Sequence, residues 1–252
     1  MKKLFLLAIL LTVCLLVFSG CSCDHIWIEA DCLNPKTCSR CAATEGEPLG
    51  HTPGEWNRTV DVVTCVATLE QHCSACNELI SSDTAPLDTL ISDNLFMFSP
   101  REFMERLTLI AEQHSYEFTY EFTSTSTGLH VLASPNGIET IIQFFYPNRT
   151  TMLYDDIDIR EVWCVSLTGI GGNDKDFRQY FLMACDPTLD KNAASVTDLN
   201  LAASLLDAAT NGELFGYYQE NHLLYESAYI AEEVFGQDFS MSMFNIYASD
   251  FR

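Results

Sequence analysis

The sequence predicts an α+β fold, in which a mainly antiparallel C-terminal sheet with flanking helices is preceded by a small module rich in cysteine and histidine. Two observations predict it. Of the 11 cysteines, seven fall between Cys23 and Cys76, and only Cys164 and Cys185 follow them. Beyond residue 98, a helical pattern is followed by several strand patterns and then by helical ones, an order typical of α+β domains. We expect boundaries at 1–20, 21–76, 77–98 and 99–252, the third segment being a linker.

The first 21 residues have the pattern of an export signal. Lys2 and Lys3 precede an unbroken apolar run over residues 4–18, which ends in small residues before Cys21. A basic start, an apolar stretch and a small-residue cut site are typical of a secretory signal peptide. The run is shorter than the about 20 apolar residues that a membrane span needs.

Ser19-Gly20-Cys21 resembles the lipobox of bacterial lipoproteins, with Phe18 where the family usually has leucine. In that family the cysteine is diacylated and becomes the new N-terminus. The resemblance implies a lipid on Cys21, a membrane anchor, and a location on the extracytoplasmic face of a bacterial membrane. Two alternatives are ordinary cleavage after Gly20, which leaves a plain thiol, and retention of the run as a short anchor.

The charge of the chain excludes one class of partner. The formal net charge is −22, and removal of Lys2 and Lys3 with the signal would make it −24. Nucleic-acid phosphates repel a protein this acidic, and no basic stripe offsets the repulsion. We therefore expect no nucleic-acid partner, and contact with the membrane only through the lipid.

Residues 23–76 contain two copies of one pattern of metal-binding residue types. Each copy supplies a histidine, a lone cysteine and a C-x-x-C pair, and Cys₃His is a standard ligand set for structural zinc. The first copy comprises His25, Cys32, Cys38 and Cys41, and the second comprises His51, Cys65, Cys73 and Cys76. We expect two structural zinc ions, with no ligand position left for a catalytic water. His72, beside Cys73, is a rival to His51 that breaks the repeat.

The repeat resembles the small zinc-ribbon-like Cys/His repeats at the start of surface lipoproteins of Gram-positive anaerobes. Their pattern reads approximately H-x-W…A-x-C…P…C-x-x-C…G…L-G-H. The first copy matches it closely from His25 to His51, whereas the second has a longer His-to-Cys spacing and lacks the proline. The resemblance covers about a fifth of the chain and implies a metal-binding module.

Disulfide bonds are the alternative to metal, because an exported protein can form them. The second copy has three cysteines, and the first has four only if Cys23 is included. Nine cysteines remain in a mature chain without Cys21, an odd number. We favour zinc over a complete set of disulfides.

The C-terminal elements follow from local signals. Ser99-Pro100-Arg101-Glu102 is a helix start with a capping box. Residues 134–137, Ser-Pro-Asn-Gly, form a turn signal that predicts a hairpin. We expect strands over 116–122, 129–133, 139–146, 161–168, 179–184 and 242–248, and helices over 195–209 and 221–235.

Chemistry in this domain is thin, and no catalytic residue is assigned. His222 and Glu226 are spaced i, i+4 and offer an acid–base pair, although a surface contact is the favoured interpretation. Cys164 and Cys185 are either a disulfide or two buried thiols. We expect a non-catalytic, lipid-anchored binding or structural protein with a protein, peptide or glycan partner. The alternatives are a tethered hydrolase of cell wall or extracellular polymer, and a zinc-handling lipoprotein.

Overall fold

The computed structural model describes residues 24–125, 128–147, 157–170, 174–234 and 237–248. It divides the chain into two compact units. Among the described residues, unit 1 contains residues 24–58 and 68–83, and unit 2 contains residues 59–67 and those from 84 to 248. Cys21 and Cys23 lie outside the described residues. No helix in the described part of the chain is long and apolar enough to cross a membrane.

Unit 1 consists of short strands. Strands β1 (Trp27–Ile28), β2 (Lys36–Cys38) and β3 (Thr44–Glu45) form one three-stranded sheet. A second sheet has the order β4 (Pro53–Asp61), β5 (Val66–Cys73) and β6 (Leu79–Pro86). The boundary between the units crosses β4 and β5, because residues 59–67 belong to unit 2.

The segment expected as a linker is ordered structure. Besides β6, it contains the two-stranded pair β7 (Ile91–Ser92) and β8 (Leu95–Phe96). Leu90, Phe96 and Phe98 are at most 1% exposed and belong to the core of unit 2. These three buried side chains lie among the polar residues of this segment, and only Phe96 and Phe98 have the i, i+2 spacing of a strand.

Unit 2 is an α+β domain, as predicted. Its antiparallel sheet has seven strands in the order β13-β14-β15-β12-β11-β10-β9. The bounds are β9 (Tyr120–Thr125), β10 (Gly128–Ala133), β11 (Thr140–Phe145), β12 (Cys164–Ile170), β13 (Phe215–Glu220), β14 (Leu223–Val234) and β15 (Gln237–Tyr247). The predicted turn at residues 134–137 joins β10 to β11 through a short 3-10 helix, Pro135–Gly137.

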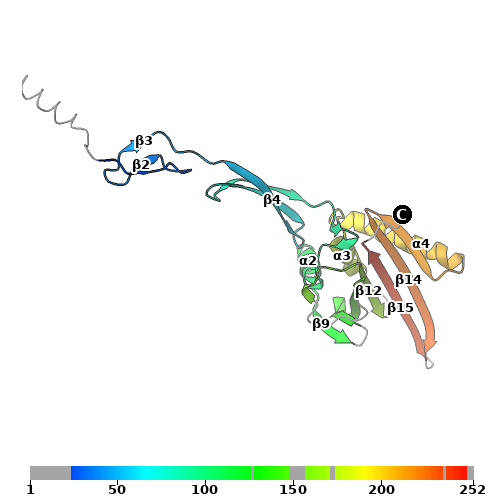
Figure 1. Ribbon diagram of the computed structural model, residues 1–252. Helices are drawn as coiled ribbons and strands as arrows, with labels where there is room; N and C mark the ends of the chain where they lie inside the picture. The colour runs from blue at the N-terminus through cyan, green and yellow to red at the C-terminus, as the bar shows by residue number, and fades with distance from the viewer. Residues whose placement is uncertain (1–23, 126–127, 148–156, 171–173, 235–236, 249–252) are drawn as a thin grey trace, which may run out of the picture. The chain divides into compact units, whose positions relative to one another are not determined.

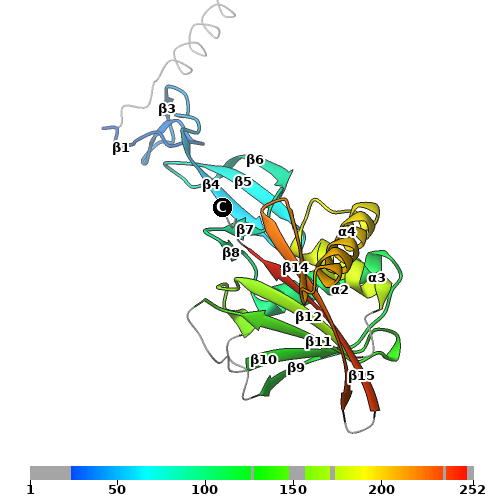
Figure 2. The ribbon, with the colours of Figure 1, turned by 90° about the vertical axis from the view of Figure 1, so that its right-hand side faces the viewer.

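Three helices accompany this sheet: α2 (Pro100–Gln113), α3 (Lys175–Cys185) and α4 (Lys191–Thr210). They lie together along one side of it (Figure 1, Figure 2). The predicted capping box is present, since Ser99 Oγ accepts from the Glu102 N–H and Glu102 Oε2 accepts from the Ser99 N–H. Phe103 of α2 packs edge-on against Phe144 of β11 and Phe181 of α3. Aromatic packing of this kind builds a core between helices and sheet.

Two expected elements are wrong. Residues 175–185 form helix α3, not a strand over 179–184, because Asp174 caps the helix and Phe177, Phe181 and Ala184 are buried at helical spacing. The expected helix over 221–235 is strand β14. Leu223, Tyr225 and Ser227 alternate into the core, and Asn221 and His222 both have positive φ in the turn after β13. Two positive-φ residues are typical of the tight turn of a hairpin.

Helix α4 comes close to strand β13, and one glycine permits it. A Cβ on Gly216 would lie 2.3 Å from the Leu205 backbone nitrogen, closer than real side chains approach. Nearby, Ser227 Oγ donates to the Leu201 carbonyl at 3.3 Å. Any larger residue at 216 would therefore displace the helix from the sheet.

Candidate metal centres

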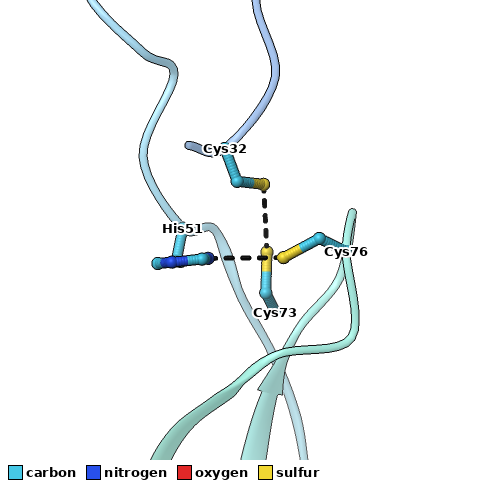
Figure 3. A group of neighbouring side chains, drawn as sticks. All are labelled: Cys32, His51, Cys73 and Cys76. Carbon is cyan, nitrogen blue, oxygen red and sulfur yellow. Dashed lines mark hydrogen bonds between the residues drawn. The ribbon is translucent and has the colours of Figure 1, made fainter. Parts of the chain in front are cut away.

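Two groups of metal-binding side chains form within unit 1. The first is His25, Cys38 and Cys41, and the second is Cys32, His51, Cys73 and Cys76 (Figure 3). Within each group all the ligand atoms lie within 4.8 Å of one another. Both groups could hold a metal ion.

The two C-x-x-C turns have the same hydrogen bonds, so the sequence repeat is also a structural repeat. The first cysteine of each pair accepts at its carbonyl from the residue four positions later, Ala42 or Asn77, at 2.9 Å. That residue has a positive φ in both turns, 56° at Ala42 and 60° at Asn77. The N–H of the first cysteine donates at 2.8 Å to the carbonyl five positions later, Ala43 or Glu78.

Each turn is also attached to its histidine in the same way. The serine after the first cysteine donates its N–H at 2.9 Å to the carbonyl of the residue that follows the histidine. Ser39 reaches Ile26 in the first turn, and Ser74 reaches Thr52 in the second. The serine hydroxyls donate to the same carbonyls at 3.1 and 3.3 Å. The shared C-S-x-C sequence thus positions a histidine beside each pair of thiols.

Two separations in the second group are close to those across a tetrahedral zinc ion. Sγ of Cys32 lies 3.6 Å from Sγ of Cys73, and Sγ of Cys76 lies 3.4 Å from Nδ1 of His51. Zinc with ordinary Zn–S and Zn–N bonds separates two sulfurs by about 3.8 Å and a sulfur from a nitrogen by about 3.6 Å. A disulfide would need sulfurs about 2.05 Å apart. All eight described cysteines are free thiols.

The backbone around each C-x-x-C turn favours thiolates, the form that binds metal. The N–H groups of Cys76 and Ala75 lower the pKa of Cys73 to about 5. Burial opposes ionisation of Cys38, but hydrogen bonds from the Arg40 N–H and from His25 lower its pKa to about 6. Hydrogen bonds to Cys73 and Cys76 raise the pKa of Cys32 to about 12, because negative sulfurs surround it. Crowded sulfurs of this kind are what a cation would stabilise.

The other nitrogen of His51 has a carboxylate neighbour. Its Nε2 lies 3.5 Å from Glu78 Oε2, while Nδ1 faces Cys76. A ligating histidine ordinarily donates its second N–H to a carboxylate or carbonyl, which fixes the ring orientation. Glu78 is therefore in position to orient His51, a role that sequence analysis did not assign. Its position five residues after Cys73 is the only sequence signal.

The grouping differs from the one expected from the order of the repeats. Cys32, placed by sequence with His25, lies instead with His51 and the second C-x-x-C pair. Cys65 lies outside both groups: it is 7% exposed in the core of unit 2, and its Sγ donates to the Val62 carbonyl. Spacing identified the residue types but not which lone cysteine reaches which turn.

The remaining candidates lie elsewhere. His72 is in neither group, and its Nδ1 lies 3.1 Å from the Asn77 carbonyl. Cys164 of β12 and Cys185 at the end of α3 are buried free thiols. His222 lies in the turn before β14 and Glu226 within that strand, so i, i+4 spacing does not make them neighbours.

Comparison with family models, with curated proteins and with solved structures finds no match to this chain. The metal groups are therefore interpreted from their own geometry.

Proposed function

We propose that unit 1 is a structural zinc module in a lipid-anchored, extracytoplasmic protein whose role is binding or structural, not catalytic. One observation supports the zinc assignment: the four ligand atoms of Cys32, His51, Cys73 and Cys76 lie within 4.8 Å of one another, and the Cys32–Cys73 and Cys76–His51 separations are close to those across a tetrahedral zinc ion. In this group four protein ligands leave no open position for a reacting water. The other zinc ion would bind the first group, His25, Cys38 and Cys41, which supplies three ligands among the described residues.

The composition of unit 1 supports a structural role for the metal. Its only buried residues of apolar type, within the described part, are Cys32, Cys38 and Cys73, and each belongs to a metal group. Domains that lack a sufficient core commonly depend on a metal or on disulfides. The lipid anchor and the extracytoplasmic location rest on the pattern of residues 2–21.

Two cysteine variants test the zinc assignment. Native mass spectrometry of the full chain should show two zinc ions in the wild type. Cys32→Ser should lose one, because it removes a ligand of the second group. Cys65→Ser is the matched control and should retain both. If Cys65→Ser loses zinc and Cys32→Ser retains it, the ligand set proposed here is wrong.

The same measurement reports the anchor. Denatured protein extracted from membranes should carry the mass of a diacylated Cys21, and Cys21→Ser should lack it. A mature chain with an unmodified Cys21 would remove the lipoprotein part of the proposal and leave the zinc part standing. Zinc that exchanges within minutes on dialysis would instead favour metal handling.

A further inference from the structure

The sheet of unit 2 has one face on which the helices do not pack. Leu129 and Val131 of β10 are fully buried in the core that contains α2 and α3, whereas Leu132, on the opposite face, is 41% exposed. The alternation continues on β11, where Ile142 is buried and Phe145 is 37% exposed. Because side chains alternate between the faces of a strand, the register identifies every residue on the exposed face.

A row of polar side chains crosses this face, from the exposed Tyr217 at one edge through the centre of the sheet, where Ser166 is only 2% exposed. Starting from Tyr217, which is 54% exposed, cross-strand pairing connects one residue on each of the seven strands. The row reads Tyr217, Glu226, Asn245, Ser166, Gln143, His130 and Thr123, from β13 to β9. No position in it is apolar, although apolar residues flank it, such as Phe145 and Leu132.

The sheet has only one sign of charge. Its seven strands contain no lysine or arginine; by register the acidic residues Glu121 and Glu226 lie on the open face, whereas Glu220 lies on the face that α4 covers. The whole chain is also strongly acidic, at −22. An acidic surface of this kind attracts cationic partners and speeds their association.

Glu226 is a half-buried carboxylate held by neutral groups. Its Oε1 accepts from Asn245 Nδ2 at 2.6 Å and from the Tyr247 hydroxyl at 3.3 Å. On the other side it shares a hydrogen bond with the Tyr217 hydroxyl. Burial, followed by the nearby Cys164 and Glu226, raises the pKa of Tyr247, which keeps this donor neutral. None of these donors neutralises the carboxylate.

Two other half-buried or buried carboxylates of unit 2 are paired with a cation, whereas Asp186 and Glu220 are held by neutral groups as Glu226 is. Arg160 binds Glu102 through two nitrogens, and Arg178 binds Asp198 likewise, with one contact at 2.7 Å. Among the described residues no cation lies against Glu226. The network therefore fixes the orientation of a carboxylate whose charge is uncompensated, next to the exposed ring of Tyr217.

We propose that the open face around Glu226 binds a basic segment of a partner protein, with an arginine or lysine side chain on the Glu226 carboxylate and against Tyr217. Charge complementarity selects the cation, since the face carries the carboxylates of Glu121 and Glu226 and no lysine or arginine. The breadth of the face selects a macromolecule, because small ligands bind in concave pockets that enclose most of their surface. Tyrosine and arginine are also enriched at the energetic centres of protein interfaces. This inference names the partner class of the binding role proposed above and depends on that role.

The test uses the full-length protein and a defined probe. A fluorescein-labelled peptide alternating arginine with serine is titrated with protein at ~0.15 M salt, where long-range attraction is screened. Fluorescence anisotropy measures its Kd. The comparison peptide has citrulline, the neutral isostere, in place of each arginine. Binding of the arginine peptide and not of the citrulline peptide is expected, and this comparison needs no variant to fold.

Glu226→Gln and Glu220→Gln form a matched pair of variants. Glu220 lies on β13 of the same sheet, and its carboxylate is likewise held by neutral hydroxyls, those of Thr197 and Tyr218. Glu226→Gln should weaken binding by about tenfold or more, the usual effect of losing a charged hydrogen bond. Glu220→Gln makes the same change in net charge and should leave the Kd within about twofold.

Three results would overturn the inference: equal loss in the two variants, equal binding of the two peptides, or no binding of the arginine peptide. Zinc content measured on the same samples reports the proposed zinc module independently. Two bound zinc ions without peptide binding would therefore reject only the inference about the open face.

Discussion

The two units of this protein are stabilised by different means. Unit 2 buries a large cluster of apolar side chains from its strands and helices, including Phe103, Leu129 and Phe181 at 0% exposure. The described part of unit 1 buries three cysteines and leaves large apolar side chains such as Leu49 and Trp56 exposed, at 74% and 51%. Burial of apolar surface therefore stabilises unit 2. Unit 1 buries too little apolar surface for this and, in our proposal, depends instead on bonds from its cysteines and histidines to metal.

Removing the metal should have the largest effect. Structural zinc contributes about 10–16 kcal/mol to small zinc domains, more than the total stability of most domains. A chelator should therefore abolish amide-hydrogen protection in residues 24–58 and 68–83 and leave residues 84–248 protected. Hydrogen-exchange mass spectrometry measures both in one sample, and added zinc should restore the first. If the amide hydrogens of unit 1 stayed protected without metal, the metal would not be what stabilises this unit, and the contrast with unit 2 would be wrong.

A substitution in the apolar core should destabilise unit 2 and leave the metal groups of unit 1 unchanged. Phe103 contacts Phe98, Phe144 and Phe181 and is fully buried. Phe103→Ala should destabilise unit 2 by about 3–5 kcal/mol, because it removes buried surface and leaves a cavity. Chemical denaturation gives the free energy of unfolding, and zinc stoichiometry should not change.

The control for this variant lies in unit 1. Leu49 is 74% exposed, so Leu49→Ala should change stability by less than about 0.5 kcal/mol. If the two substitutions had similar costs, the apolar core would not distinguish the units.

The sequence predicted the contrast between a Cys/His-rich module and an α+β domain better than it predicted the individual helices and strands. Local signals were sufficient where one turn decides the structure, as at the Ser99 capping box and the Pro135–Gly137 turn. They failed at β14, because residues 223–234 become a strand through pairing with β13 and β15, and those partners are set by the whole sheet. Tertiary pairing overrode the helical pattern there.

The metal groups illustrate the same limit. Each C-x-x-C pair is a local turn, and the sequence identified both pairs and both histidines. The lone cysteine is a long-range ligand, since Cys32 is 41 residues from Cys73. Which lone cysteine completes a site depends on how the chain folds between the turns. Repeat order carries no information about that.

The smallest expected effect concerns the charge at the start of helix α2. Burial opposes ionisation of Glu102, but hydrogen bonds from Arg160 and from the Ser99 N–H outweigh it and lower the pKa from 4.5. A carboxyl whose pKa is lower in the folded state stabilises the protein above its unfolded value. That stability is lost as the pH falls through the folded pKa.

Glu102→Gln should therefore cost about 1 kcal/mol or less at neutral pH, as partly exposed ion pairs do. The cost should begin to shrink as the pH falls below the unfolded value of 4.5, and should vanish below the lower folded pKa, where the wild-type carboxyl is also neutral. Glu105→Gln, on the exposed side of the same helix, is the control and should have little effect at any pH. Denaturation curves at several pH values measure the difference between each variant and the wild type. If the cost of Glu102→Gln were independent of pH, the ion pair would not stabilise this helix start. Packing alone would then stabilise it, as it does the rest of unit 2.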